Sequence, residues 1–357
     1  MESRNRFFTT FDKALLLGSG CGIILLCVLA GVFFYLWQNP PRTGGQSAPT
    51  QALAFPTLAP ASTATAFDFP TPTLPVLAAE TLGPTLVPSP LPAFFDNSQP
   101  TGKIVYTCYI KQIDQICLMN ADGSGQTQLT SVDATAFYAS LSPDGKTIYF
   151  SSRHSGSFEI YSIGADGRDQ QRLTSGIGAL YAPELSPDGR LILFTNGSRG
   201  IWVMNANGKN PRPITTENDI DPAWSPDGSM IAFASSRQGS RQLFIMNADG
   251  SNVRQVTNLP EMGGRSTWSP DGSKLAFYAG PVNGRNIYTI NIDGTGLAQL
   301  TSGGDNLGPS WSPDGNWIAF TSFRDRNNEI YIMRPDGTNP IRLTNNAISD
   351  WQPRWGR

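Results

Sequence analysis

Histidine is almost absent from this sequence: His154 is its single copy among 357 residues. A metal site built from several histidines is therefore excluded, and a serine–histidine–aspartate triad would depend on one residue in a predicted loop. Charge is also sparse, since charged residues make up 15% of the chain and the formal net charge is −2. A basic surface for nucleic acid is not indicated.

Cysteine is scarce as well, and its four copies show no spacing typical of zinc sites. Cys21 and Cys27 lie in an apolar run without further ligands nearby. Cys108 and Cys117 flank CYIKQIDQIC, which we predict to be a hairpin. A Cys108–Cys117 disulfide is permitted outside the cytoplasm, and two free buried thiols are the alternative. We predict no metal site and no cofactor.

The 24 residues from Ala14 to Trp37 carry no charge. At about 1.5 Å per residue, they are long enough to cross a hydrocarbon core of about 30 Å. The run is too long, and its end too bulky, for a cleaved signal peptide. Three basic residues precede it, so we expect a cytoplasmic tail at 1–13, a transmembrane helix at 14–37 and an extracytoplasmic remainder.

Residues 38–100 contain 13 prolines and four charged residues. Proline lacks an amide donor and disfavours both helices and central strands. We therefore predict a disordered to polyproline-like linker that separates the next domain from the cell membrane.

From Thr101 onward the sequence repeats itself. The motif SPDG occurs five times, and its serines are separated by 44, 39, 44 and 43 residues. Each copy is followed by an apolar–polar alternation, a second apolar segment such as QLFIM, an Asp-Gly or Asn-Gly pair and a short segment such as RQVT. These signals predict four strands in a unit of about 43 residues, which is typical of a propeller blade.

The two ends of the repeat region complete each other. Residues 102–130 contain the second to fourth strands of a unit, and the C-terminal WQPRWGR contains a first strand alone. We therefore predict an all-β, six-bladed propeller over residues 101–357, closed by the C-terminal strand. Closure of the ring hides sheet edges that would otherwise invite aggregation.

The unit PAWSPDGSMIAFASSRQGSRQLFIMNADGSNVRQVT resembles the repeat of the TolB-type propellers, which are relatives of the WD-type propellers. The resemblance covers about residues 101–357. It implies a bacterial protein that is exported and acts as a binding module or scaffold. TolB proteins carry an additional N-terminal α/β domain, where this chain has the apolar run and the linker. We therefore do not expect this chain to bind the particular partners of TolB.

The recurring motifs have structural explanations. SPDG presents a proline and a glycine at the corners of a turn, so we interpret it as a turn former and not as a catalytic motif. NADGSGQTQL is similar to a calcium loop, but its outer ligand positions are Leu118 and Leu129, which cannot bind calcium. We assign the repeated tryptophans to packing between blades: Trp224, Trp268, Trp311 and Trp355.

The segments that do not repeat carry the candidate ligand-binding residues. Inter-blade segments and the loops between second and third strands share one face of a propeller. We expect a rim made of Asp133, Tyr138, Tyr181, Glu184, Asp219, Asp221, Glu261, Asp305, Asp350, Arg153, Arg199, Arg237, Arg285 and Arg324. These charges either pair between blades and stiffen the rim, or form a polar mouth for a ligand.

The expected function is a non-catalytic binding scaffold at the cell envelope, whose partner is a protein, a peptide or a glycan. The alternative is an envelope hydrolase or lyase that uses carboxylates at the propeller mouth.

Overall fold

In a computed structural model of the chain, the structure describes residues 99–131 and 133–357. The helix expected at 14–37 lies outside these residues, and so does the linker up to residue 98. Within the described ranges, no helix has the length and apolar character needed to cross a membrane.

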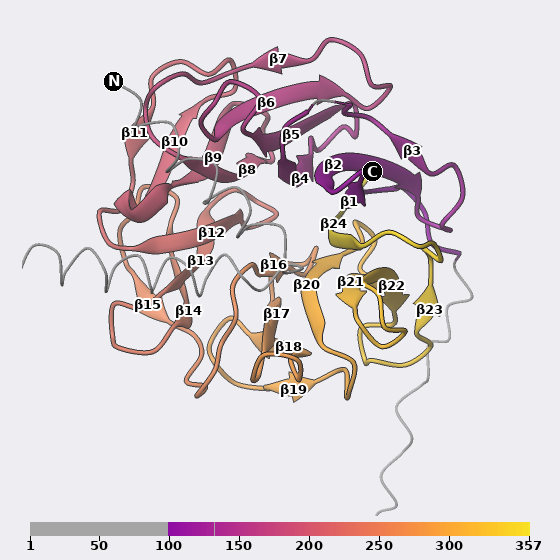
Figure 1. The fold of residues 1–357 in the computed structure, drawn as a ribbon. Coiled ribbons are helices and arrows are strands. Elements are labelled where there is room, and N and C mark those ends of the chain that lie inside the picture. The colour runs from indigo at the N-terminus through magenta and orange to yellow at the C-terminus, as the bar shows by residue number, and fades with distance from the viewer. Residues whose placement is uncertain (1–98, 132) are drawn as a thin grey trace, which may run out of the picture. The chain divides into compact units, whose positions relative to one another are not determined.

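Six antiparallel sheets of four strands surround one axis (Figure 1). Blade 1 contains β24 (Asp350–Gly356), β1 (Lys103–Ile110), β2 (Ile113–Asn120) and β3 (Thr127–Gln128). Blade 2 contains β4 (Ala136–Leu141), β5 (Thr147–Ser152), β6 (Glu159–Gly164) and β7 (Gln171–Arg172). Blade 3 contains β8 (Leu180–Leu185), β9 (Leu191–Asn196), β10 (Ile201–Asn205) and β11 (Arg212–Pro213), with a 3-10 turn at Gly197–Arg199.

The remaining blades follow the same order. Blade 4 contains β12 (Asp219–Trp224), β13 (Met230–Ser235), β14 (Gln242–Asn247) and β15 (Arg254–Gln255). Blade 5 contains β16 (Thr267–Trp268), β17 (Lys274–Ala279), β18 (Asn286–Asn291) and β19 (Ala298–Gln299). Blade 6 contains β20 (Asn306–Trp311), β21 (Ile318–Ser322), β22 (Glu329–Met333) and β23 (Ile341–Arg342). The predicted six-bladed propeller is confirmed.

The C-terminal strand closes the ring, as predicted. β24 pairs with β1, with Ile104 opposite Trp355 and Cys108 opposite Asp350. The Trp355 indole Nε1 donates a hydrogen bond to the Thr101 carbonyl at 2.8 Å. The Sγ atoms of Cys108 and Cys117 are bonded to each other and join β1 to β2.

The SPDG segments are tight turns between the first and second strands. In blade 4, the Ser225 hydroxyl donates to the Asp227 carboxylate at 2.6 Å and accepts the Met230 amide at 2.9 Å. Gly228 has a φ of 72°, a left-handed conformation that glycine adopts without strain. The same serine–aspartate bond forms in all five copies, so the turn interpretation is confirmed.

A threonine fixes the outer edge of every blade. Its hydroxyl accepts an amide hydrogen bond from the third strand at 2.9–3.0 Å; the six residues are Thr130, Thr174, Thr215, Thr257, Thr301 and Thr344. In five blades this hydroxyl also donates to a Gln, Glu or Asn side chain that precedes the amide. The short fourth strand is thereby held to the blade.

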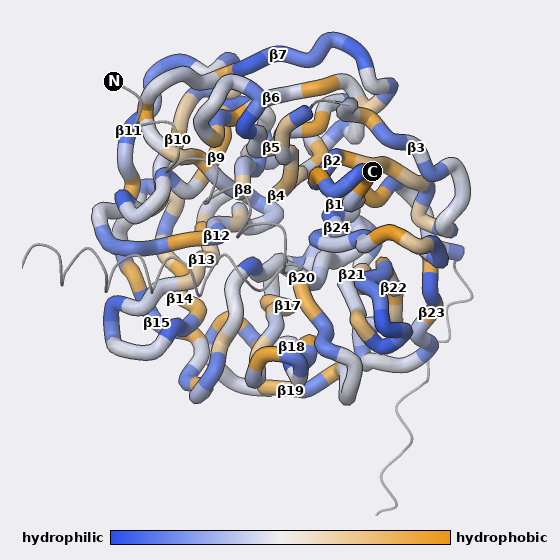
Figure 2. The backbone as a smooth tube through the Cα atoms, viewed as in Figure 1, coloured by the Kyte–Doolittle hydropathy of each residue, from blue (hydrophilic) through white to orange (hydrophobic). Residues whose placement is uncertain are grey.

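Hydrophobic side chains of neighbouring blades pack together in shared clusters. The outer strand β7 is hydrophilic (Figure 2). The four repeated tryptophans are buried in clusters that join adjacent blades, as predicted. For example, Trp268 of blade 5 packs in one cluster with Leu243 of blade 4, and its Nε1 donates to the Ala223 carbonyl at 3.1 Å.

Candidate functional site: a buried polar cluster on the propeller axis

The propeller has two ends with different chemistry. One end, the loop face, carries the inter-blade segments and the loops between second and third strands. The other end, the turn face, carries the SPDG turns and the Asp-Gly turns. The first strand of each blade runs along the axis from the loop face to the turn face.

These first strands share a backbone feature that turns one residue per blade out of the regular strand geometry. Its φ is positive in all six blades, at Tyr138, Ala182, Asp221, Arg265, Gly308 and Gln352. The strand register shifts at this position in blades 1, 2, 3, 4 and 6. Bulges of this kind change the direction in which a side chain points. A tyrosine or arginine with a positive φ is strained, so its contacts with neighbouring residues must stabilise this conformation.

Six side chains near the axis form what we call the axial cluster. Each comes either from the residue with the positive φ or from the residue two positions after it: Tyr138, Glu184, Asp221, Arg265, Gln352 and Arg354. Arg265 extends from blade 5 to blade 2, which is three blades away in a ring of six. Its Nη2 donates to the Ala139 carbonyl at 3.0 Å, and its guanidinium carbon lies 5.2 Å from the Tyr138 ring centroid. Arg265 therefore spans the axis.

Two glycines allow Arg265 to occupy this place. Its backbone amide donates to the Asp221 carboxylate at 3.0 Å. A Cβ atom on Gly264 would lie 2.3 Å from that carboxylate, and one on Gly263 would lie 2.0 Å from the Tyr278 ring. Gly264 thus allows the close approach of this segment to blade 4, and Gly263 allows its close approach to β17 of blade 5.

Arg354 reaches from blade 1 to blades 5 and 6. Its Nη2 lies 3.2 Å from the Ser266 carbonyl oxygen, and its Nη1 lies 3.5 Å from that of Pro309. The Glu184 carboxylate accepts the Trp224 amide at 3.0 Å. Two arginines and two acids thus share the centre of the propeller, and the exposed fractions of Arg265, Arg354 and Asp221 are 5%, 7% and 8%.

Burial dominates the electrostatics of the cluster. It raises the pKa of Glu184, although the positive charges of Arg354 and Arg265 act in the opposite direction. Burial, and then the charge of Arg354, lowers the pKa of Arg265 to about 9. The pKa of Tyr138 is raised by burial and by the charge of Asp221. With a pKa of about 9, Arg265 remains mostly charged at neutral pH. Burial also lowers the pKa of Arg354, and the charges of Glu184 and Asp221 oppose this effect.

The arginines keep unused hydrogen-bonding capacity. Within the part of the chain that the structure describes, Nε and Nη1 of Arg265 and Nε of Arg354 are buried without a hydrogen-bond partner. Gln352 Oε1 is in the same situation. Buried polar groups in folded proteins are normally satisfied, so this concentration of unpaired atoms marks the axis as a place for ligand or water.

The residues expected on the rim fall into three groups: residues that lie on the axis, arginines that are paired or stacked, and acids that differ in exposure. Tyr138, Glu184 and Asp221 lie on the axis and not on the rim, because their strands carry them into the interior. Arg265, Gln352 and Arg354 were missed by the sequence analysis. They occupy the same repeat positions as the three predicted residues. An alignment of the six first strands therefore identifies all six as residues that face the axis.

Several rim arginines are paired or stacked. Arg237 lies 2.7 Å from Asp219 in the same blade, and Arg285 lies 2.6 Å from Asp305 in the segment leading to blade 6. Other predicted arginines make different contacts: Arg199 with the Ile177 carbonyl, Arg153 with the Phe158 ring, and Arg324 with Ser322 and the Tyr331 ring. The predicted pairing between blades is thus found at Arg285, whereas the Arg237 pair lies within one blade.

The other predicted acids differ in exposure. Asp133 and Glu261 are exposed on the loop face. Asp350 is fully buried and accepts a hydrogen bond from Asn346 at 2.7 Å. Burial raises the pKa of Asp350 to about 6, and the charge of Glu329 adds to this effect.

An aromatic group adjoins the axial cluster in blades 2 and 3. The Phe158 ring centroid lies 5.1 Å from those of Phe137 and Tyr181, and the Tyr138 centroid lies 4.7 Å from that of Phe137. The predicted residue Tyr181 therefore lies beside Tyr138.

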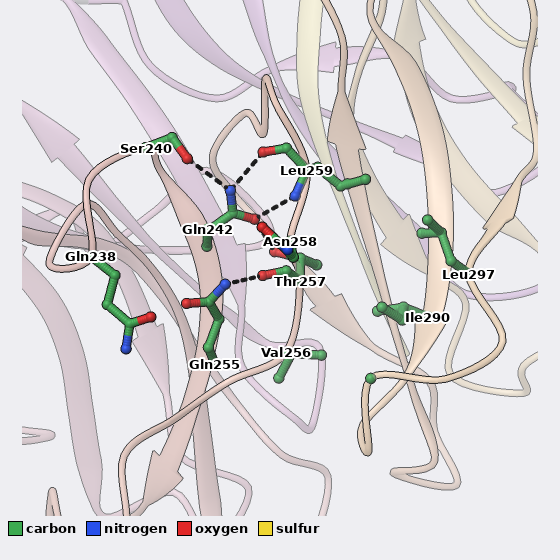
Figure 3. Close-up of a pocket in the computed structure, with 11 residues that line it drawn as sticks. Gln238, Ser240, Gln242, Gln255, Val256, Thr257, Asn258, Leu259, Ile290 and Leu297 are labelled. Carbon is green, nitrogen blue, oxygen red and sulfur yellow. Dashed lines mark hydrogen bonds between the residues drawn. The ribbon is translucent and has the colours of Figure 1, made fainter.

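A pocket of about 650 Å³ lies at the outer edge between blades 4 and 5 (Figure 3). Gln242 lines it, but its amide bonds internally to Ser240, Thr257 and Leu259. The residues that line this pocket include no charged side chain. It is therefore a weaker candidate for specific recognition than the axis.

A second pocket, of about 250 Å³, lies on the turn face and includes a member of the axial cluster. Four blades contribute its lining: Pro143, Glu184, Leu185, Pro187, Ala223, Trp224, Ser225, Pro226, Thr267 and Trp268. Glu184 thus connects the buried cluster to the surface. Among the described residues, no group of three or more His, Cys, Asp or Glu side chains is arranged to hold a metal ion.

Comparison with solved structures shows similar propellers. TolB from Acinetobacter baumannii superposes with a TM-score of 0.65 and 25% identity, over 71% of this chain and 66% of that one. A putative TolB from Agrobacterium tumefaciens gives a TM-score of 0.56 and 19% identity, over 68% of this chain and 89% of that one.

At the sequence level, an uncharacterized protein of Agrobacterium fabrum is 33% identical over 81 residues, which are 22% of this chain and 28% of that protein. The chain therefore covers less than two thirds of this relative and of the Acinetobacter structure. The family model of the TolB beta propeller domain matches residues 91–200, 177–263 and 252–357. The chain belongs to the TolB beta propeller domain family.

Proposed function

We propose that this propeller is a binding module that holds a peptide segment of a partner protein at its axis. The observation that carries the proposal is the pair of buried arginines with unused donors, Arg265 and Arg354. An unsatisfied buried donor costs about 1–3 kcal/mol, so several of them at one place favour a bound acceptor. Peptide carbonyl and carboxylate oxygens supply such acceptors.

The fold supports this proposal. Its six blades form a closed ring around one axis, so the residues that line the axis are held in fixed positions for recognition of a partner. The aromatic group of Phe137, Phe158 and Tyr181 adds apolar contact area beside the axis. Tyrosine and arginine are the residue types that most often dominate binding energy at protein interfaces.

The proposal includes the place of action. The apolar run at 14–37 would anchor the chain in the cell membrane and the proline-rich segment would hold the propeller outside, in the cell envelope. Protease treatment of intact cells after outer-membrane permeabilisation tests this topology. Cleavage of the propeller supports it, and full protection until the cell membrane is lysed contradicts it.

A peptide and oligosaccharide array, probed with the full-length chain, tests the binding function. We expect a defined set of peptides to bind wild type and to bind Arg354→Lys at least tenfold more weakly, because lysine keeps the charge but removes the Nε donor. Arg212→Lys is the matched control, since Arg212 is exposed on the outer strand β11. Absence of any ligand, or equal binding by both variants, contradicts the proposal.

One observation favours the alternative of an envelope hydrolase or lyase. Glu184 has a raised pKa and lines a pocket, as a general acid would. Turnover of an array ligand by wild type and its loss in Glu184→Gln would support an enzyme. Binding without turnover supports the module.

A further inference from the structure

The turn-face pocket has one charged side chain in its lining, the Glu184 carboxylate. Its Oε1 accepts the Trp224 amide, and the described residues make no further hydrogen bond to this carboxylate. Arg354 and Arg265 are the cations that act on it, but neither forms an ion pair with it within 4.0 Å among the described residues. Glu184 is half-buried. It has therefore lost part of its hydration and gained one hydrogen bond in return.

Most of the residues that line the pocket beside Glu184 have apolar side chains. Trp224 and Trp268 come from adjacent blades, and three prolines come from the SPDG turns of blades 2, 3 and 4. Aromatic and proline surfaces pack well against the aliphatic stem of lysine or arginine, and indole rings attract a cation. Small side chains on blades 4 and 5, Ala223 and Thr267, leave room beside Glu184.

The edge of the pocket is acidic. Asp144, Asp188 and Asp227 each follow a lining proline, and hydrogen bonds from the serine of the same turn lower the pKa of all three. These carboxylates are ionised at neutral pH. Lys146 and Arg190 lie on the same turns, but both are outside the lining, and Arg190 faces Asp188 at 3.8 Å.

We propose that the turn-face pocket binds one cationic side chain, arginine or lysine, of the partner peptide, with Glu184 as its anion. The inference rests on the proposed binding function. It adds the chemical class of one ligand side chain and the face of the propeller from which that side chain enters. The cation completes the partners of Glu184, its stem packs against Trp224 and Trp268, and the aspartates at the edge attract it. The partner thus approaches from the turn face.

Titration of the full-length chain with three blocked tripeptides tests this inference. The probes are acetyl-Gly-Arg-Gly-amide, acetyl-Gly-Lys-Gly-amide and acetyl-Gly-citrulline-Gly-amide, of which the last is a neutral isostere of the first. We expect the arginine or the lysine probe to bind, and the citrulline probe to bind at least tenfold more weakly. Binding should fall by a similar factor in Glu184→Gln, which retains the acceptor for the Trp224 amide.

Two controls separate the inference from trivial effects. Glu217→Gln removes an exposed acid on the loop face and should leave probe affinity unchanged. Thermal unfolding of each variant verifies that it is folded. Absence of binding by both cationic probes, equal affinity for the citrulline probe, or unchanged affinity in Glu184→Gln overturns the inference.

A negative tripeptide titration can be distinguished from failure of the proposed function. If array peptides bind in an Arg354-dependent manner while the tripeptide result is negative, the module stands and the cation pocket is wrong. If the cationic probe binds and depends on Glu184, the cation pocket is supported, and the Arg354 comparison tests the module separately.

Discussion

The guanidinium of Arg265 lies 5.2 Å from the ring of Tyr138 on the opposite blade. This contact, together with the bond from Arg265 Nη2 to the Ala139 carbonyl, links blades 5 and 2 through the axis. β24 follows blade 6 along the chain and pairs with β1 of blade 1, which closes the ring. The propeller is therefore held together both around the ring and across it.

Substitution of Arg265 should destabilise the fold strongly. Arg265→Gln removes the cation that faces Asp221 and Glu184, and it leaves the buried Asp221 and the half-buried Glu184 with one compensating arginine. Breaking a buried charge network by removal of one partner typically costs about 3–5 kcal/mol. Urea unfolding of Arg265→Gln measures the loss, and Arg153→Gln, exposed on the loop face, is the control. A loss below about 1 kcal/mol would show that the axial contacts contribute little.

Asp350 should make the closing blade sensitive to pH. Its folded pKa is raised from 3.8 to about 6, so the folded state takes up a proton that the unfolded state lacks between these values. Stability from this group is therefore highest below pH 4 and falls as the pH rises to 6. Two pKa units correspond to roughly 2–3 kcal/mol, to be treated as an upper value.

Asp350→Asn tests this expectation. The asparagine still accepts from Asn346 and carries no charge, so the variant should be more stable than wild type at pH 8 and equal to it at pH 4. Unfolding free energies at the two pH values provide the comparison. A variant that is less stable at pH 8 contradicts the account.

The SPDG turns should give the opposite pH response. The Ser225 hydroxyl and the Ser229 amide and hydroxyl hold the pKa of Asp227 at about 2, below the usual 3.8. The stability that Asp227 contributes is present above pH 4 and lost as the pH falls from 4 to 2. Asp227→Asn should therefore reduce stability at pH 7 and lessen the acid-induced loss, as measured by thermal unfolding between pH 2 and 7. An unchanged acid profile would argue against this role.

The sequence predicts most of the fold because its signals are local. Ser-Pro-Asp-Gly determines a turn within four residues, and the alternation after it determines a strand, as at Ile231 and Phe233. The incomplete repeat units at the two ends of the repeat region together predict the sixth blade. Each of these signals is independent of residues far along the chain.

The site was predicted less completely because it combines distant positions. Arg265 and Arg354 are 89 residues apart, and they reach one axis only after the ring closes. The first strand of blade 5, Thr267–Trp268, is short, and the preceding Gly-Gly-Arg lacks the apolar alternation that marks a strand. Which acids reach the axis and which remain on the rim depends on the bulge in each first strand.

The central claim is that the arginines of the axial cluster bind the partner. The most direct test is the dissociation constant of an array-selected peptide for wild type and for Arg354→Lys, measured by calorimetry on folded protein. We predict at least tenfold weaker binding in Arg354→Lys, with Arg212→Lys equal to wild type. Equal dissociation constants for wild type and Arg354→Lys would contradict the claim.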